Sequence, residues 1–459
     1  MNSSKYNGIT DGVIWKQLML FFLPVLLGTF FQQLYNTVDA VIVGRFVGKE
    51  ALAAVGGSSS QILNLLIGFF TGVTSGAAVI VAQYYGARDA EDSSRSVHTA
   101  MILAIACGAI MTVVGILTAP ALLRIMETPE DTMADSIVYM RWVYMAMIPG
   151  MVYNMGSAIL RAVGDSKHPL YFLIACCLIN VVLDLLFVVT FKMGVAGAAI
   201  ATALSQLLSA VMICWFLARP KTEESVRLEL SKLRTDWRIM RRTVHIGLPS
   251  GLQAVLYSIS NMIILTAINR FGTDTAAAWV AMGKVDAFTW LVLSAMGLAV
   301  MTFVGQNFGA NSMQRVRESI RDCMIMTSVF AVLISALFLT LGKYLLVIFT
   351  TDQNVIALAM RIIYYIMPWY LLYVPVEVYS GSLRGIGDTL VPFIITAVGI
   401  CIARVVWIFT IVPLHNDIST VAVAYPITWG LTSLAYMIYF RYVKKHKICL
   451  LYTSPSPRD

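Results

Sequence analysis

Two aspartates lie inside long apolar segments of the chain, and each has an amide neighbour at helical spacing. Asp39 stands in the segment QQLYNTVDAVIVG, and Asp184 stands in INVVLDLLFVV. Asn36 precedes Asp39 by three positions and Asn180 precedes Asp184 by four, so each amide lies on the same helix face as its carboxylate. A carboxylate among apolar residues costs free energy unless it has a partner or a function. These residues are therefore the first candidates for chemistry.

Both carboxylates fall at a depth that two hydroxyl groups also reach. Measured along the helix axis from the starts of their segments, Asp39 lies at about 31 Å and Asp184 at about 22 Å. Tyr139 and Thr202 reach a similar layer on neighbouring segments. Such an oxygen-rich pocket suits a hard cation such as Na⁺, and two crowded carboxylates can also carry a proton. The alternative is that these groups only join helices by hydrogen bonds. The ligand set for a metal ion would be Asp39, Asn180, Asp184 and Thr202.

The second half of the chain carries different ionisable residues in its apolar segments. Two acids and two bases are present there, and they either neutralise one another as an internal ion-pair network or line a substrate path. This asymmetry indicates that one half couples ions, whereas the other helps to bind cargo or to hold the halves together. The candidates for a substrate path are Asn154, Tyr257, Lys284, Asp286, Glu377 and Arg404.

The elements that must position these residues are membrane-spanning helices. Of the 459 residues, 58% are hydrophobic and only 13% are charged, and the mean hydropathy is +0.77. A soluble domain carries about 25% charged residues. Twelve apolar runs are each long enough to cross a hydrocarbon layer about 30 Å thick. We therefore predict an all-α integral membrane protein with spans near 15–43, 51–83, 95–119, 133–158, 169–191, 194–218, 244–269, 276–305, 319–341, 355–382, 391–413 and 419–441.

The chain contains the same unit twice. The phrase LRAVGD at 160–165 returns as LRGIGD at 383–388, and AQYYGA at 82–87 returns in the same register as GQNFGA at 305–310. Each half holds six predicted helices, an even number, so the two repeats are parallel. We expect an N-lobe of six spans over 1–218, a linker over 219–242 and a C-lobe of six spans over 243–448.

Basic residues lie predominantly in the loops of one side. Although the net charge is +8, this placement favours a membrane topology over a nucleic-acid partner. The 219–242 connection alone holds eight, namely Arg219, Lys221, Arg227, Lys232, Arg234, Arg238, Arg241 and Arg242. The opposite loops hold six, namely Arg45, Lys49, Arg124, Lys192, Arg270 and Lys343. Both termini are therefore expected in the cytoplasm, with the protein in the plasma membrane of a prokaryote.

Enzymatic functions find little support in the motifs. The run GIGD at 385–388 fits the G-x-G-D pattern of intramembrane aspartyl proteases, but its Asp lies at a predicted cytoplasmic loop. A helix stop, turn and restart explains the repeated phrase better, because Gly-Asp follows an Arg and a Pro opens the next helix. No G-x-x-x-x-G-K-[ST] loop is present, which argues against an ATP-driven pump.

The chain ends with the segment CLLYTSPSPRD, which differs in character from the helices before it. It can be encoded by a DNA sequence that resembles a transposase sequencing adapter. Residues 449–459 are therefore expected to be foreign to the fold.

The chain resembles the multidrug and toxic compound extrusion (MATE) family, in particular its bacterial, DNA-damage-inducible-like branch. Three features carry the resemblance: the doubled six-helix plan, the two LR-x-x-GD phrases and the segment LPVLLGTFFQQLYNTVDAVIVGRFVGKEALAAVG at 23–56. The resemblance covers about 10–445. It implies a V-shaped pair of six-helix bundles that exports organic cations and other drugs in exchange for H⁺ or Na⁺ by alternating access. It also implies a cation site at Asp39, Asn180, Asp184 and Thr202 and a hinge at Pro24. Spacing and depth add Asn36 and Tyr139 as candidates beside that site.

The resemblance also sets expectations about ligands and partners. No cofactor other than the coupling ion is expected, the cargo would be a small-molecule drug, and the protein would work as a monomer in the lipid bilayer. Another branch of the family has a Glu in helix 7 that serves a second Na⁺ site. In this chain Tyr257 stands near that position instead. A lipid-linked glycan flippase of the same superfamily remains an alternative, although the acidic N-half argues against it.

Overall fold

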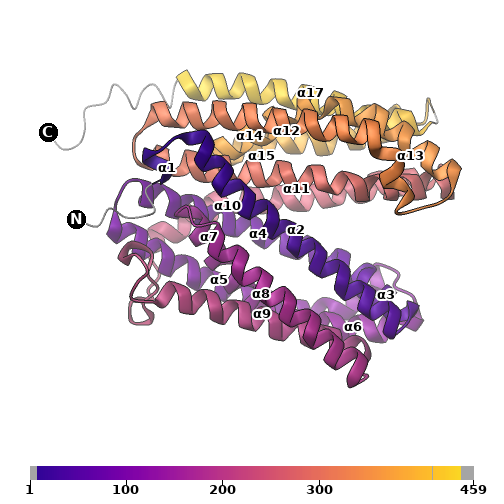
Figure 1. The fold of residues 1–459 in the computed structure, drawn as a ribbon, viewed down its shortest axis with the longest axis horizontal. Helices are drawn as coiled ribbons and strands as arrows, with labels where there is room; N and C mark the ends of the chain where they lie inside the picture. The colour runs from indigo at the N-terminus through magenta and orange to yellow at the C-terminus, as the bar shows by residue number, and fades with distance from the viewer. Residues whose placement is uncertain (1–7, 416, 446–459) are drawn as a thin grey trace. The chain divides into compact units, whose positions relative to one another are not determined.

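The structure is a computed structural model that describes residues 8–415 and 417–445, so the ending 449–459 lies outside the described residues. Within those ranges the chain is helical and contains no strand (Figure 1). It forms two compact units. Unit 1 contains Met19–Gly251, and unit 2 contains Thr10–Leu18 and the chain from Leu252 onward. The boundaries fall inside two long helices, and the 219–242 linker belongs to unit 1.

Unit 1 is organised around a central helix, α7, which packs against α4, α5 and α9. Its helices are α2 (Ile14–Phe46, from Met19), α3 (Lys49–Gly56), α4 (Ser58–Gly86), α5 (Ala90–Ile125), α6 (Glu130–Met145), α7 (Met147–Ala162), α8 (Lys167–Asp184) with the π-helical turn η1 (Leu185–Thr190), α9 (Gly194–Ala218), the short turns η2 (Glu224–Val226) and η3 (Leu230–Lys232), and the first part of α10 (Trp237–Asn269).

Unit 2 is organised in a similar way around α14, which packs against α11, α12 and α17. A short turn, α1 (Gly8–Asp11), precedes α2. The helices of this unit are the remainder of α10, α11 (Thr273–Gly309), α12 (Met313–Val347), α13 (Gln353–Ile366), η4 (Met367–Trp369), α14 (Tyr370–Gly385), α15 (Leu390–Thr396), the π-helical turn η5 (Ala397–Ile402), α16 (Ala403–Thr410) and α17 (Ile418–Val443).

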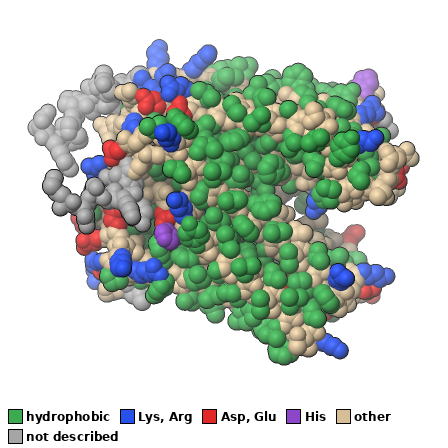
Figure 2. Space-filling view, in the orientation of Figure 1, with side chains coloured by type: hydrophobic (Ala, Val, Ile, Leu, Met, Phe, Trp, Pro, Cys, Tyr) green, Lys and Arg blue, Asp and Glu red, His purple; other side chains and the backbone are tan. Residues whose placement is uncertain are grey.

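The helices have the length and surface of membrane spans. Eleven spans in the described chain are long and apolar enough to cross a membrane. The twelfth predicted run, 133–158, is the pair α6 and α7, which is bent by 49°. Pro149, which lacks a backbone N–H, stands just after the bend. Large apolar side chains cover the outside of the helices, with charged ones gathered at helix ends (Figure 2). The all-α membrane fold is thus confirmed, with twelve spans if the bent pair counts as one.

The repeated phrase forms the same helix end in each unit. In unit 1 the N–H of Asp165 donates to the carbonyl of Leu160 at 2.8 Å, and Gly164 has a φ of 97°. In unit 2 the N–H of Asp388 donates to the carbonyl of Leu383 at 2.9 Å, and Gly387 has a φ of 88°. This is the glycine-dependent helix stop that the sequence predicts. The phrase terminates helices and supplies no protease site.

Small residues bring the start of α10 against α4 within unit 1. A Cβ built on Gly72 would lie 2.2 Å from the backbone N of Gly251, and one on Gly76 would lie 2.6 Å from that of Gly247. Both helices therefore carry glycines four positions apart at their contact, a spacing that lets backbones approach closely. This contact explains why α10 begins as part of unit 1.

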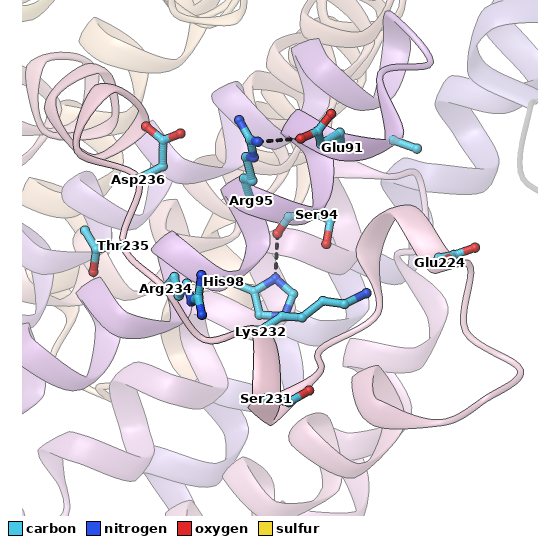
Figure 3. Close-up of a pocket in the computed structure, with 11 residues that line it drawn as sticks. Glu91, Ser94, Arg95, His98, Glu224, Ser231, Lys232, Arg234, Thr235 and Asp236 are labelled. Atoms are coloured by element: carbon cyan, nitrogen blue, oxygen red, sulfur yellow. Dashed lines mark hydrogen bonds and ion pairs between the residues drawn. The ribbon is translucent and has the colours of Figure 1, made fainter.

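The linker is anchored to α5 by a buried histidine. Nδ1 of His98 lies 2.7 Å from the carbonyl of Ser94, and the backbone N–H of Glu229 donates to Nε2 at 3.1 Å. A cavity of about 760 Å³ lies at this attachment. Figure 3 shows the ring of His98 beside the side chain of Lys232 of the linker, whereas Arg95 of α5 points towards Glu91. Arg227 and then Lys232 bond to the carboxylate of Glu229 and hold its pKa below the usual range. Polar and charged residues make up most of the lining of the cavity, which belongs to the attachment of the linker.

Candidate functional site

The two aspartates predicted from the sequence meet inside unit 1. Asp39 lies in the C-terminal part of α2, and Asp184 is the last residue of α8 before its π-helical turn. Asp39 is 6% exposed and Asp184 is fully buried, and their carboxyl groups lie close enough for their charges to interact. Asn180, one turn earlier on α8, is 1% exposed. The helical spacing of Asn180 and Asp184 therefore places both groups on the buried face, as expected.

Hydroxyl groups complete this cluster. Thr202 of α9 is 6% exposed and accepts a hydrogen bond from the hydroxyl of Tyr35 at 3.2 Å. The hydroxyls of Tyr35 and Tyr139 lie close enough to both carboxylates to interact with their charges. Tyr139 also packs on a buried apolar cluster of α2, α3, η1 and α9, which includes Val43 and Val188. Apolar packing thus holds the oxygen atoms together and keeps water away.

Most carboxylate and amide oxygens of this cluster lack hydrogen-bond donors. Within the described chain, Oδ1 of Asp39, both carboxylate oxygens of Asp184 and both polar atoms of Asn180 are buried without a partner. A buried polar atom without a partner costs about 1–3 kcal/mol. The oxygens among them suit a cation or a proton that comes and goes. No three His, Cys, Asp or Glu side chains gather as metal ligands among the described residues, so Na⁺ would need the amide and hydroxyl oxygens as well.

The other predicted residues of this half lie apart from the cluster or at its edge. Asn36 is exposed, although it lies three positions before Asp39. Asn154 is half-buried in α7. Pro24 lies inside α2, where it removes one backbone hydrogen bond and weakens the helix. The structure therefore assembles four of the predicted residues with Tyr139 and leaves Asn36 outside.

A second candidate site is a cavity of about 650 Å³ within unit 2. It is lined by residues of α10, α11, α13, α14, α16 and α17. Most of the substrate-path candidates are among them, namely Tyr257, Asp286, Glu377 and Arg404. Lys284 is exposed and is not part of its lining. Aromatic side chains form much of the wall, namely Tyr257, Trp279, Trp290, Tyr373 and Tyr425.

The acids of this cavity have partners of their own. Asp286 accepts hydrogen bonds from the hydroxyl of Tyr370 at 2.5 Å and from the indole N–H of Trp290 at 2.9 Å. Glu377 accepts one from Tyr373 at 3.3 Å. Gly297 makes room for Glu377, because a Cβ there would lie 1.9 Å from its Oε1. These carboxylates are therefore fixed in place, unlike those of unit 1.

The ion-pair network considered from the sequence is not formed. In the described chain no ion pair within 4.0 Å joins Lys284 or Arg404 to Asp286 or Glu377. The count of two acids and two bases did not predict the contacts, because the neutral donors Tyr370 and Trp290 bond to the carboxylate of Asp286 instead. An aromatic residue four positions from an acid, as Trp290 is from Asp286, was the available sign.

Comparison with known proteins identifies the family of the chain. The MatE family profile matches residues 24–186 and 249–410, which together are more than half of the chain. The chain belongs to the MatE family. It is 28% identical over 443 residues to "Probable multidrug resistance protein YoeA" of Bacillus subtilis (strain 168), with 95% of each chain covered. It is 22% identical over 376 residues to "Multidrug export protein MepA" of Staphylococcus aureus (strain NCTC 8325 / PS 47), with 82% of each covered.

Solved structures share the fold. A MATE crystal structure described as being in the bent conformation matches with a TM-score of 0.90 at 20% identity, covering 98% of this chain and 99% of its own. The chain is thus a multi-pass membrane transporter of the MatE family and not an enzyme. The MATE resemblance noted from the sequence is confirmed.

Proposed function

We propose that this MatE protein is a secondary antiporter that exports organic cations and other small drugs in exchange for H⁺ or Na⁺ by alternating access. The observation that carries the proposal is the pair Asp39 and Asp184, which are buried close enough for their charges to interact and have no donors for most of their oxygens. Two such carboxylates resist simultaneous ionisation, so the pair readily holds one proton or one cation.

Exchange follows if the cluster binds its ion in one state and releases it in the other. In the outward-facing state a proton or Na⁺ neutralises the pair and favours the release of a cationic drug. In the inward-facing state the ion leaves, the charge returns and the next drug is attracted. Differential affinity of a few kcal/mol between the two states is enough to bias this cycle.

The excess of basic residues in the 219–242 linker supports cytoplasmic termini and a place in the plasma membrane of a prokaryote. The protein would act as a monomer in the bilayer and would need no cofactor other than the coupling ion. Two labels test the orientation: a cysteine at Thr222 in the linker should react only from the cytoplasm, and one at Glu130 only from outside. The reverse pattern in intact cells contradicts the topology.

The experiment that tests the function is drug efflux from proteoliposomes under an imposed gradient of Na⁺ alone or H⁺ alone. Efflux should follow one of the two gradients and should stop when that gradient is collapsed by an ionophore. Efflux that proceeds equally without either gradient would show that the protein is not an antiporter for these ions.

A further inference from the structure

A groove of about 560 Å³ lies between α10 and α16 in unit 2. α10 lines it with the residues at 259, 262, 263, 266, 267 and 270, and these steps of three and four positions place them along one face of the helix. The other wall comes from Ile408 and Phe409 of α16 and from Val412 and Pro413 just after it. The groove therefore follows α10 for about three turns.

The walls of this groove are apolar along most of their length. Ile408 and Val412 are buried, whereas Met262 and Phe409 are 42% and 61% exposed, so the groove opens towards the hydrocarbon layer. Thr266 also lines it, but its hydroxyl donates to the carbonyl of Met262 at 2.9 Å within its own helix. An empty groove would forfeit dispersion contacts on its open side. A hydrocarbon chain is the occupant that fits such walls.

One guanidinium stands at the end of the apolar walls. Arg270 directly follows α10, lines the groove and has an exposed side chain. In the part of the chain that the structure describes, no carboxylate lies within 4.0 Å of it. A guanidinium binds phosphate oxygens strongly, often through two parallel N–H···O bonds. The groove thus combines a surface for a hydrocarbon chain with a donor for a phosphate.

The length of the groove matches one leaflet of a bilayer. Arg270 lies 11 positions after Ile259, a rise of about 16 Å along the helix axis. Half of a hydrocarbon core about 30 Å thick is about 15 Å. With Arg270 at the level of the headgroups, the groove therefore ends near the middle of the bilayer, where an acyl chain also ends.

We propose that the groove between α10 and α16 holds one anionic phospholipid, with an acyl chain along α10 and the phosphate accepting hydrogen bonds from Arg270. The positive charge of Arg270 favours a headgroup of net negative charge and disfavours a cationic drug. The topology proposed above makes this a lipid of the outer leaflet. The site itself rests neither on that topology nor on ion coupling.

The test measures lipid binding to the purified full chain by native mass spectrometry in detergent. No gradient is present, so a failure of ion coupling cannot imitate a negative result. The probes are dioleoyl phosphatidylglycerol and dioleoyl phosphatidylcholine, which have the same acyl chains and differ in the net charge of the headgroup. The wild-type protein should bind phosphatidylglycerol about fivefold more tightly, the factor expected for one basic residue beside an anionic headgroup.

Two variants test the two parts of the site. Arg270→Gln should remove the preference by weakening phosphatidylglycerol alone. Lys343→Gln is its matched control, because Lys343 is an exposed cation of the same unit outside the groove. Ala267→Phe fills the groove and should weaken both lipids by about tenfold. Ala336→Phe makes the same change at an exposed position of α12 outside the groove and should alter neither affinity.

Equal affinity of the two lipids for the wild-type protein would overturn the proposal, as would a preference that survives in Arg270→Gln. An equal loss in Lys343→Gln would show a general effect of charge and would reject the assignment to Arg270. Affinities that Ala267→Phe leaves unchanged would place the lipid outside the groove. Displacement of phosphatidylglycerol by the lipophilic cation tetraphenylphosphonium would show that the groove receives cargo, and would reject the lipid as its occupant.

Discussion

The buried acids of the two units have opposite surroundings, although the units descend from one repeated plan. Asp39 and Asp184 of unit 1 have each other and several buried oxygens without donors. Asp286 of unit 2 has two neutral donors, Tyr370 and Trp290. A carboxylate with fixed donors is held in one state, whereas a pair without donors changes state when an ion arrives. We therefore propose that ion coupling belongs to unit 1 and that unit 2 holds the exported molecule.

The largest effect expected from this comparison is on the acids of unit 1. Asp39→Asn and Asp184→Asn should each reduce gradient-driven efflux by about 100-fold or more, because a neutral amide cannot exchange a proton and binds Na⁺ weakly. Thermal stability in detergent should stay the same or increase, since each change removes a buried charge without a partner. Efflux from proteoliposomes and thermal unfolding measured on the same preparations check both parts.

Thr37→Val is a suitable control for this experiment, because Thr37 lies on the exposed side of α2 and bonds only to the backbone of its own helix in the described structure. Its efflux should equal that of the wild type. Well-folded Asp39→Asn and Asp184→Asn proteins that export at the wild-type rate would remove the pair from the mechanism.

The next prediction concerns the pH dependence of drug binding, which distinguishes H⁺ from Na⁺ as the ion exchanged at Asp39 and Asp184. Tetraphenylphosphonium is a suitable probe because its charge does not change with pH. If a proton is exchanged, binding without Na⁺ should tighten by up to about tenfold per pH unit as the pH rises and the pair loses its proton. The dependence should flatten in Asp39→Asn. Binding is measured from about pH 5 to about pH 8.

The opposite result is equally informative. A wild-type curve that is flat with pH, together with competition by millimolar Na⁺, excludes the proton and leaves Na⁺ as the coupling ion. Asp286→Asn is the matched comparison, because it makes the same chemical change in unit 2 and should leave the pH dependence as in the wild type.

Asp286→Asn should have an effect of a different kind. An amide in place of this carboxylate can accept only one of the two bonds from Tyr370 and Trp290, and it turns an N–H₂ towards the other donor. We expect a loss of about 1–3 kcal/mol of stability, with efflux still coupled to the gradient. Thermal unfolding and proteoliposome efflux measure the two properties. Loss of coupling without loss of stability would contradict the division between the units.

The sequence predicted the elements better than the contacts. Hydropathy and the repeated phrases were sufficient for twelve spans and for two matching helix ends, because apolar length and glycine are local properties. Asp39 and Asp184 could be paired because helical rise gives depth along the membrane normal. Asn36 failed to join them because three positions on a helix turn a side chain by about 60° from its partner, enough here to leave it exposed.

Contacts across helices were out of reach of the same reasoning. Nothing in the spacing of Asp286 or Arg404 reveals that Tyr370 occupies the acid or that Tyr425 lies against the guanidinium, since these partners come from helices far away in sequence. Depth and charge predict which residues can come into contact, whereas the packing of the helices determines which contacts form.

The smallest expected effect tests where the two units are alike. Gly164 and Gly387 have φ values of 97° and 88°, a conformation that costs a residue with a Cβ about 1–2 kcal/mol. Gly164→Ala and Gly387→Ala should therefore lower the thermal stability by similar amounts and leave ion coupling unchanged. Gly56→Ala is the control, because a Cβ there meets nothing within 4 Å and φ is not positive. Unequal losses at the two glycines would mean that the repeated phrase has a second task in one unit, and that the units differ at their helix ends as well as at their buried acids.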